Sequence, residues 1–251
     1  AARSFGGAGD RGLNEGQIRG NVHTVAVWVF GGVPGWFITQ SHGILSFMSA
    51  QTLTKLSRRL NHQAGQNGRL PSVLLLTDQV RLPDPMAAAD RLPRGGGIIL
   101  RNYDDPHREA LGRDLMALCK MRGLFLLIAG DWRLAWKLGA HGVHLPQWQT
   151  ARAPVMPRHM GKPGWIITAA AHSQTALLRA ARRGVHAALL SPIFPTASHP
   201  GAPVLGPIRF SRLIGQVPLP VYGLGGITVH NGLRLNNSGA VGLAAISALA
   251  A

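Results

Sequence analysis

The chain has 251 residues, of which 46% are hydrophobic, so it holds enough apolar material for one large domain or two smaller ones. Its single cysteine, Cys119, excludes an internal disulfide framework and a zinc site built from several cysteines, and makes a reducing, intracellular compartment the default expectation. The formal net charge is +16, and all ten acidic residues lie at or before Asp131. This charge favours an anionic partner, a phosphate-bearing metabolite or a nucleic acid, unless it only reflects an arginine-rich coding bias.

Residues 1–47 show no sustained hydrophobic period, and their apolar stretch AVWVFGGVPGWF is too short to span a bilayer. Gly and Pro interrupt this stretch, and no cleavage site typical of a signal peptide stands out. Met48 is followed by a basic helical pattern, SAQTLTKLSRRLNHQ. We therefore expect residues 1–47 to be an irregular extension, either disordered or absent from the native protein, and residues 48–71 to form a basic helix and a linker.

From residue 72 onward, short apolar runs typical of buried parallel strands alternate with amphipathic helical patterns. The expected helices include 84–92, opened by Asp-Pro, then 107–123, and 173–184, which ends in Arg and Gly. Eight such units predict a single closed (β/α)8 TIM barrel, an α/β fold, over residues 72–251 rather than an open sheet. The eight expected strands are 72–78, 96–102, 123–130, 141–146, 165–172, 185–194, 219–226 and 240–247.

The turns after the last two expected strands have the composition of a phosphate site. A TIM barrel binds its ligand at the carboxyl ends of the strands, commonly with a phosphate in the loops after strands seven and eight. GLGGIT follows the seventh strand and AAISAL the eighth. Gly225 and Gly226 would let backbone N–H groups approach a phosphate closely, and the amides near Ile246 and Ser247 would point toward it from a following helix. The alternative is that the glycine pair only forms a turn.

Several motifs occur in a recognisable order along this barrel. They are LLLTD (74–78), ILRNY (99–103), GVHLPQ (142–147), AAHS (170–173), SPIFPTASHPGAPVLGP (191–207), PVYGLGGIT (220–228) and GAVGLAAISAL (239–249). Together they resemble the thiamin phosphate synthase/TenI family over residues 72–249. The resemblance implies a cytoplasmic thiamin-biosynthesis enzyme that binds phosphorylated thiazole and pyrimidine substrates, without a nucleic-acid or membrane partner; a homo-oligomer is left open.

The resemblance also implies which residues hold the thiazole phosphate. The loop 191–207 would follow the sixth strand and close over the phosphates, with Thr196 and Ser198 at hydroxyl positions and His199 where the family has a lysine. The prolines of this loop would keep its donors preorganised. The alternative is a proline-rich connector without a ligand. The implied backbone contacts to the thiazole phosphate are those of Gly225, Gly226, Ile246 and Ser247.

In the family, the synthase joins hydroxymethylpyrimidine diphosphate to the thiazole phosphate, with Mg²⁺ on the diphosphate. Arg101 matches a diphosphate-binding arginine, but the nearby lysine position is Tyr103, and two metal-binding carboxylate positions read Gly130 and Gln149. Asp131 lies one position beyond the first of these, a shift that usually turns a side chain away. We therefore assign no metal ligand and expect Mg²⁺ only if the synthase reaction is retained, because an unassisted diphosphate is a poor leaving group.

The TenI branch of the family resembles the synthase but includes thiazole tautomerases that need no metal and use a histidine after strand five as proton carrier. His172 in AAHS matches this histidine. Three hypotheses follow: a synthase that relies on Arg101, a TenI-like tautomerase or auxiliary protein that uses His172, and a non-catalytic basic barrel. The third is weakest for nucleic acid, because no aromatic-basic ridge accompanies the arginines.

Overall fold

The computed structural model describes residues 28–30, 33–35, 42–66, 68–151, 164–196, 201 and 203–249, with side chains described from residue 51 onward. The chain divides into two units, Ala1–His42 and Gly43–Ala251. In the first unit, β1 (Trp28–Phe30) pairs antiparallel with β2 (Val33–Gly35). Most of the expected extension, residues 1–47, lies outside the described residues, and its assignment stays a prediction.

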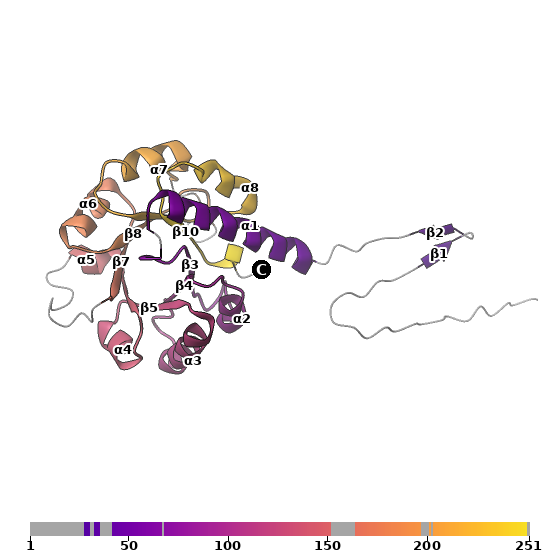
Figure 1. Ribbon diagram of the computed structural model, residues 1–251, viewed down its shortest axis with the longest axis horizontal. Helices are drawn as coiled ribbons and strands as arrows, with labels where there is room; N and C mark the ends of the chain where they lie inside the picture. The colour runs from indigo at the N-terminus through magenta and orange to yellow at the C-terminus, as the bar shows by residue number, and fades with distance from the viewer. Residues whose placement is uncertain are drawn as a thin grey trace, which may run out of the picture. The chain divides into compact units, whose positions relative to one another are not determined.

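The second unit contains eight parallel strands that close into a barrel (Figure 1). Strands that follow one another along the chain pair in parallel, and β10 pairs with β3 to close the cylinder. The TIM barrel is thus confirmed, with its eight strands in the expected places. They are β3 (Val73–Leu76), β4 (Gly97–Leu100), β5 (Phe125–Ala129), β6 (Gly142–Leu145), β7 (Ile166–Ala171), β8 (Ala187–Leu190), β9 (Val221–Leu224) and β10 (Gly242–Ala245).

Helices alternate with the strands and surround the barrel (Figure 1). The side chains of Asp84 and Ser173 accept hydrogen bonds from the first turns of α2 and α6, and Gly123 ends α3 in the left-handed conformation, as the sequence pattern predicts. The helices are α1 (His42–Gln63), α2 (Pro85–Asp90), α3 (Arg108–Arg122), α4 (Trp132–Lys137), α5 (Gln147–Ala151), α6 (Gln174–Arg182), α7 (Gly206–Ile214) and α8 (Val229–Gly232), with the 3-10 helices η2 (Leu233–Leu235) and η3 (Ser247–Leu249).

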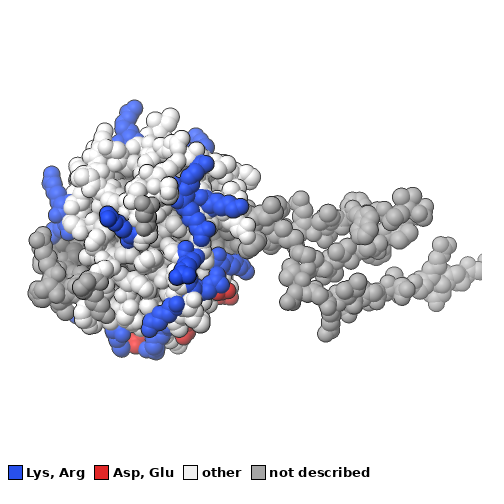
Figure 2. Space-filling view, viewed as in Figure 1, with Lys and Arg blue, Asp and Glu red and all other residues white. Residues whose placement is uncertain are grey.

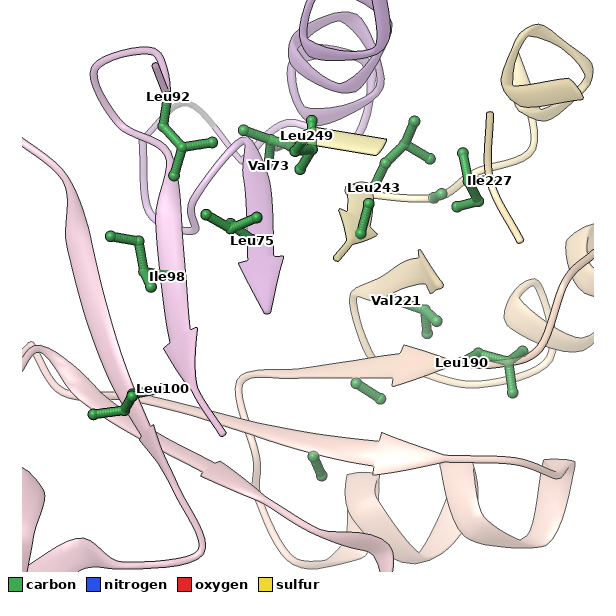
Figure 3. Close-up of a cluster of buried hydrophobic side chains, with 14 of the residues drawn as sticks. Val73, Leu75, Leu92, Ile98, Leu100, Leu190, Val221, Ile227, Leu243 and Leu249 are labelled. Atoms are coloured by element: carbon green, nitrogen blue, oxygen red, sulfur yellow. The ribbon is translucent and has the colours of Figure 1, made fainter. Parts of the chain in front are cut away.

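Alternating strand residues divide the apolar core into two layers. Val73 and Leu75 of β3 belong to the layer between strands and helices, which also includes Leu115 of α3 and is shown in part in Figure 3. Leu74 and Leu76 belong to a second cluster inside the barrel. Because successive side chains of a strand point to opposite faces, continuous apolar strands of this kind must be covered on both sides.

Helix α1 is fastened to the amino ends of β3 and β10. Ser57 Oγ donates to Ser72 O at 2.6 Å and accepts from Leu243 N at 2.7 Å, and Asn61 Nδ2 donates to Val241 O at 2.9 Å. The apolar face of α1 is buried through Leu53, Leu56 and Leu60. The sequence pattern predicts that the basic helix starts at Met48. In the structure the helix begins earlier, at His42. Helix α1 therefore lies at the amino ends of the strands, and the loops that follow the strands lie at the opposite end of the barrel.

On the face of the barrel that α1 crosses, the basic side chains are spread out rather than gathered in one strip (Figure 2). Figure 2 shows Lys and Arg side chains across the face that α1 crosses, with few carboxylates beside them. Lys55, Arg58 and Arg59 of α1 are among the exposed basic residues. Within the part of the chain that the structure describes, no helix has both the length and the apolar composition needed to cross a membrane.

His144 of β6 is a buried polar residue inside the barrel. Its Nδ1 lies 2.9 Å from Thr168 Oγ1 of β7. Burial, with a smaller contribution from the charge of Arg101, lowers the pKa of His144 to about 3 from the ordinary value of 6.5. The imidazole is therefore neutral in the folded protein at neutral pH, and it packs the barrel rather than exchanging protons.

The pKa of His144 predicts a loss of stability in acid. The unfolded histidine takes up a proton near pH 6.5 and the folded one does not, so its contribution is complete above that pH and is lost as the pH falls toward 3. Between pH 7 and pH 5, the free energy of unfolding of the wild type should fall by about 2 kcal/mol more than that of His144→Gln. Urea unfolding measures this difference; parallel pH profiles would contradict it.

Candidate active site

The carboxyl ends of the barrel strands, with the residues that directly follow them, form the mouth of the barrel. Leu76 and Ile99 face the barrel interior. Because strand side chains alternate, the residues two positions later, Asp78 and Arg101, face the mouth, and their side chains meet there. The same alternation along β7 brings His172 to the mouth. Polar side chains from at least three strands thus converge at this end of the barrel.

A close contact between two loops shapes one side of the mouth. Gly225 and Gly226 follow β9 with φ angles of 95° and 65°, in the region that favours glycine. A Cβ on Gly226 would lie 2.2 Å from Pro195 O, and one on Gly225 would lie 2.9 Å from Pro192 Cα. Phe194 N donates to Gly225 O at 3.0 Å. The loop after β9 therefore packs directly against the loop after β8, and only glycine fits at both positions.

The ends of β9 and β10 are neighbours, since Ala244 pairs with Leu224. We call the backbone of Gly225, Gly226, Ile246 and Ser247 the rim. Among the described residues, none accepts a backbone hydrogen bond from the N–H of Gly225, Gly226 or Ile246. Ser247 is exposed, and its Oγ lies 3.5 Å from Arg81 O on the loop after β3. The structure therefore brings the four predicted phosphate-contact residues to one place.

His172 is held at the end of β7 by two neighbouring elements. Its Nδ1 lies 3.0 Å from Ser191 O and 3.1 Å from Ser191 Oγ, at the end of β8. Its backbone N–H donates to Gln147 Oε1 at 2.9 Å, at the start of α5. Ser191 directly precedes the loop that packs on the rim glycines, so His172 and the rim are connected through a single loop.

Arg101, the other predicted catalytic residue, is bound to a carboxylate that the sequence analysis did not single out. Its Nη2 lies 2.5 Å from Asp78 Oδ2, and Arg81 Nη2 lies 2.6 Å from the same oxygen. These contacts, those of Arg81 first, hold the pKa of Asp78 well below its usual value despite partial burial. Asp78 is therefore ionised throughout the neutral range and fixes two guanidinium groups beside β3 and β4.

The residues at the family's metal positions do not fit Mg²⁺, a hard ion that needs oxygen ligands. Gln149 Nε2 donates to Gly130 O at 2.8 Å, so a hydrogen-bond donor faces the carbonyl oxygen there. A Cβ on Gly130 would lie 3.1 Å from Tyr103 Cε1 and 3.7 Å from Gln149 Nε2, which leaves little room for a carboxylate. Asp131 Oδ1 instead accepts from Leu134 N at 2.9 Å and caps α4.

No group of three or more His, Cys, Asp and Glu side chains within the described ranges is arranged to hold a metal ion. That the chain supplies no metal ligand stays a prediction. The arrangement can bind an anion through backbone amides and guanidinium groups, and it can exchange a proton through an imidazole.

Arg108, at the start of α3, is a residue of this region that the sequence analysis missed. Its Nη2 donates to Ala129 O and, at 3.4 Å, to Leu100 O, so it joins the ends of β4 and β5. Its guanidinium carbon lies 5.5 Å from the centroid of the Tyr103 ring. Burial lowers the pKa of Arg108, and the nearby charge of Asp131 opposes this shift. An arginine in the first turn of a helix gives no sequence signal for such contacts.

The remaining predicted residues belong to the loop after β8. Thr196 is described and partly buried. Ser198 and His199 lie outside the described residues, so their proposed contacts with substrate stay predictions.

Comparison with known proteins agrees with this geometry. Residues 79–249 match the family model described as thiamine monophosphate synthase. The chain is 33% identical over 183 residues to a putative thiamine-phosphate synthase 2 of Aquifex aeolicus, covering 71% of this chain and 97% of that protein. It is 36% identical over 161 residues to a thiamine-phosphate synthase of Roseiflexus castenholzii, covering 62% and 70%.

Among solved structures, the barrel is similar to a thiamine phosphate pyrophosphorylase from Pyrococcus furiosus. The TM-score is 0.59 at 25% sequence identity, over 73% of this chain and 89% of that one. The resemblance that the motifs indicate is therefore confirmed by sequence and by structure. With a matching family model, similar curated relatives and the same barrel, the chain belongs to the thiamine monophosphate synthase/TenI family.

Proposed function

We propose that this protein binds a thiazole phosphate through the rim and that His172 transfers a proton on the bound thiazole without a metal ion. The reaction is a tautomerisation, as the TenI branch of the family implies. One observation carries the proposal: the hydrogen bond between His172 Nδ1 and Ser191 O, 3.0 Å long, beside the loop that packs on the rim. The ligand then occupies the side of the mouth formed by β7 to β10.

The contact with Ser191 O favours one tautomer of His172. A carbonyl oxygen can only accept a hydrogen bond, so the 3.0 Å contact is a hydrogen bond when Nδ1 carries the proton, and this is the tautomer of the proposed mechanism. In the neutral imidazole the lone pair then lies on Nε2. Nε2 takes a proton from one ring position of the thiazole, and the imidazolium returns it to another, so no proton, electron or atom is gained or lost.

The rim suits the phosphate of such a ligand. Residues 132–251 contain no Asp or Glu, so no carboxylate from these elements repels an anion at the rim. Backbone N–H groups without a backbone acceptor among the described residues can donate to phosphate oxygens, and the positive φ angles of Gly225 and Gly226 arrange them at the end of β9. The phosphate would anchor the ligand while its ring faces His172.

The second candidate is the synthase reaction. Arg101 and the names of the relatives in Aquifex aeolicus and Roseiflexus castenholzii favour it. The Gln149 amide against Gly130 O weighs against it, because the departing diphosphate would lack the charge that stabilises it in the transition state. The tautomerase therefore remains the function that the geometry supports best.

Replacing His172 should stop the proton transfer and leave binding intact. His172→Gln keeps a polar side chain but removes the base, so thiazole tautomerisation followed by NMR should slow by about 100-fold or more. The dissociation constant of the His172→Gln variant for thiazole phosphate should stay within about twofold of the wild-type value. His62→Gln on α1, at the opposite end of the barrel, is the matched control and should keep full activity. Equal rates in His172→Gln and wild type would contradict the proposal.

The synthase reaction is tested with hydroxymethylpyrimidine diphosphate, thiazole phosphate and Mg²⁺. We expect no thiamin phosphate or pyrophosphate, and we expect tautomerisation to be unchanged when EDTA replaces Mg²⁺. Formation of thiamin phosphate that disappears in Arg101→Ala would establish the second candidate instead.

A methyl group on Gly226 should disturb the rim. In Gly226→Ala the new Cβ collides with Pro195 O, so the amides must shift and thiazole phosphate should bind at least about tenfold more weakly, each lost charge-assisted hydrogen bond having roughly this effect. Gly184→Ala is a matched control, because Gly184 has a similar φ of 70° but open space around its Cβ. Isothermal titration calorimetry measures both affinities. Equal affinity in the two variants would show that the rim does not bind the phosphate.

A further inference from the structure

The loop after β9 turns two successive carbonyl oxygens toward the loop after β8. Leu224 O accepts from Ile193 N at 3.0 Å, and Gly225 O accepts from Phe194 N at 3.0 Å. A trans peptide unit is planar, and its N–H points opposite to its C=O. The N–H groups of Gly225 and Gly226 therefore point away from the loop after β8. Because β9 lies between β8 and β10, they point toward the β10 side of the rim.

The next carbonyl oxygen of this loop is held by Asn231 of α8. Asn231 Nδ2 donates to Gly226 O at 2.8 Å, and Asn231 Oδ1 accepts from Thr228 N at 2.8 Å. Thr228 Oγ1 in turn accepts from Asn231 N at 3.3 Å. A single side-chain amide thus fixes the orientation of the peptide unit that joins Gly226 to Ile227.

The N–H of Ile227 belongs to this peptide unit, so it points away from Asn231. Among the described residues, none accepts a hydrogen bond from it. Ile227 is only 5% exposed. Backbone N–H groups of buried residues are almost always hydrogen-bonded in folded proteins. The position of Ile227 N–H, directly after the two rim glycines, therefore suits an acceptor that a ligand supplies.

We propose that Ile227 N–H is a further donor to the phosphate held at the rim, and that Asn231 is the positioning residue that presents it. The inference rests on the proposed function for the identity of the ligand. Successive N–H groups in a left-handed stretch of backbone form a concavity that binds anions, and Gly225 and Gly226 have φ angles of 95° and 65°. Ile227 extends this concavity by one donor, up to Thr228, whose N–H is already bonded to Asn231 Oδ1. The alternative is that Asn231 only caps α8.

The amide proton resonances of the wild-type protein test the Ile227 donor without any substitution. On titration with thiazole phosphate, the resonances of Gly225, Gly226 and Ile227 should move downfield, because their N–H groups come to donate to a charged oxygen. The amide of Thr228, already bonded to Asn231, should move least. The thiazole alcohol that lacks the phosphate should leave the Ile227 resonance in place.

The same titration separates this inference from the proposed function. Downfield shifts of Gly225 and Gly226 without a shift of Ile227 would overturn the inference and leave the proposed function standing. No shift at any of the three amides would overturn both.

The positioning role of Asn231 is tested by isothermal titration calorimetry. Asn231→Ala removes the hydrogen bond to Gly226 O, so thiazole phosphate should bind about tenfold more weakly, the effect of losing one hydrogen bond to a charged group, with the affinity for the alcohol unchanged. Thr228→Ala is the matched control, because it removes the cap bond from Asn231 N but keeps the Asn231 amide, and it should change neither affinity. Equal losses of phosphate affinity in the two variants, or equal losses for phosphate and alcohol in Asn231→Ala, would overturn the positioning role in favour of the cap.

Discussion

The packing of the loop after β9 against the loop after β8 is the constraint on which the rest of the site depends. No side chain larger than hydrogen fits between Gly226 and Pro195 O, where a Cβ would lie 2.2 Å from the carbonyl oxygen. This contact fixes the glycine amides at the rim. Through Ser191, which precedes the same loop, it is also connected to His172, whose Nδ1 contacts Ser191 O. The proposed phosphate binding and the proposed proton transfer would thus both depend on this one contact between loops.

The two sides of the mouth differ in the chemical groups that they present. The side formed by β7 to β10 has glycine amides and an imidazole but no carboxylate, so it is suited to an anion and a proton transfer. At the ends of β5 and β6, a glutamine amide faces Gly130 O where a metal site would need acidic ligands. Between them, the shared carboxylate of Asp78 orders two arginines. Among the described residues, two guanidinium groups and the rim amides supply the positive charge of this mouth.

Much of the architecture was predictable, because parallel strands buried on both faces appear in the sequence as continuous apolar runs. The positions of Gly225, Gly226, Ile246, Ser247 and His172 followed from their places after such runs together with the family resemblance. The contacts of Gln149 and Arg108 were not predictable, since long polar side chains choose partners only after the strand ends are assembled. Asp78 could have been noticed, because it lies two residues after an inward-facing leucine and three before an arginine.

The central claim is that a thiazole phosphate binds with its phosphate on the rim and its ring beside His172. A crystal structure of the protein soaked with thiazole phosphate and Mg²⁺ tests this claim most directly. The account predicts phosphate oxygens within hydrogen-bond distance of the Gly225 and Gly226 amides, the thiazole ring against His172 Nε2, and no metal between Gly130 and Gln149. A ligand bound elsewhere in the mouth, or a magnesium ion seated at Gln149, would contradict it.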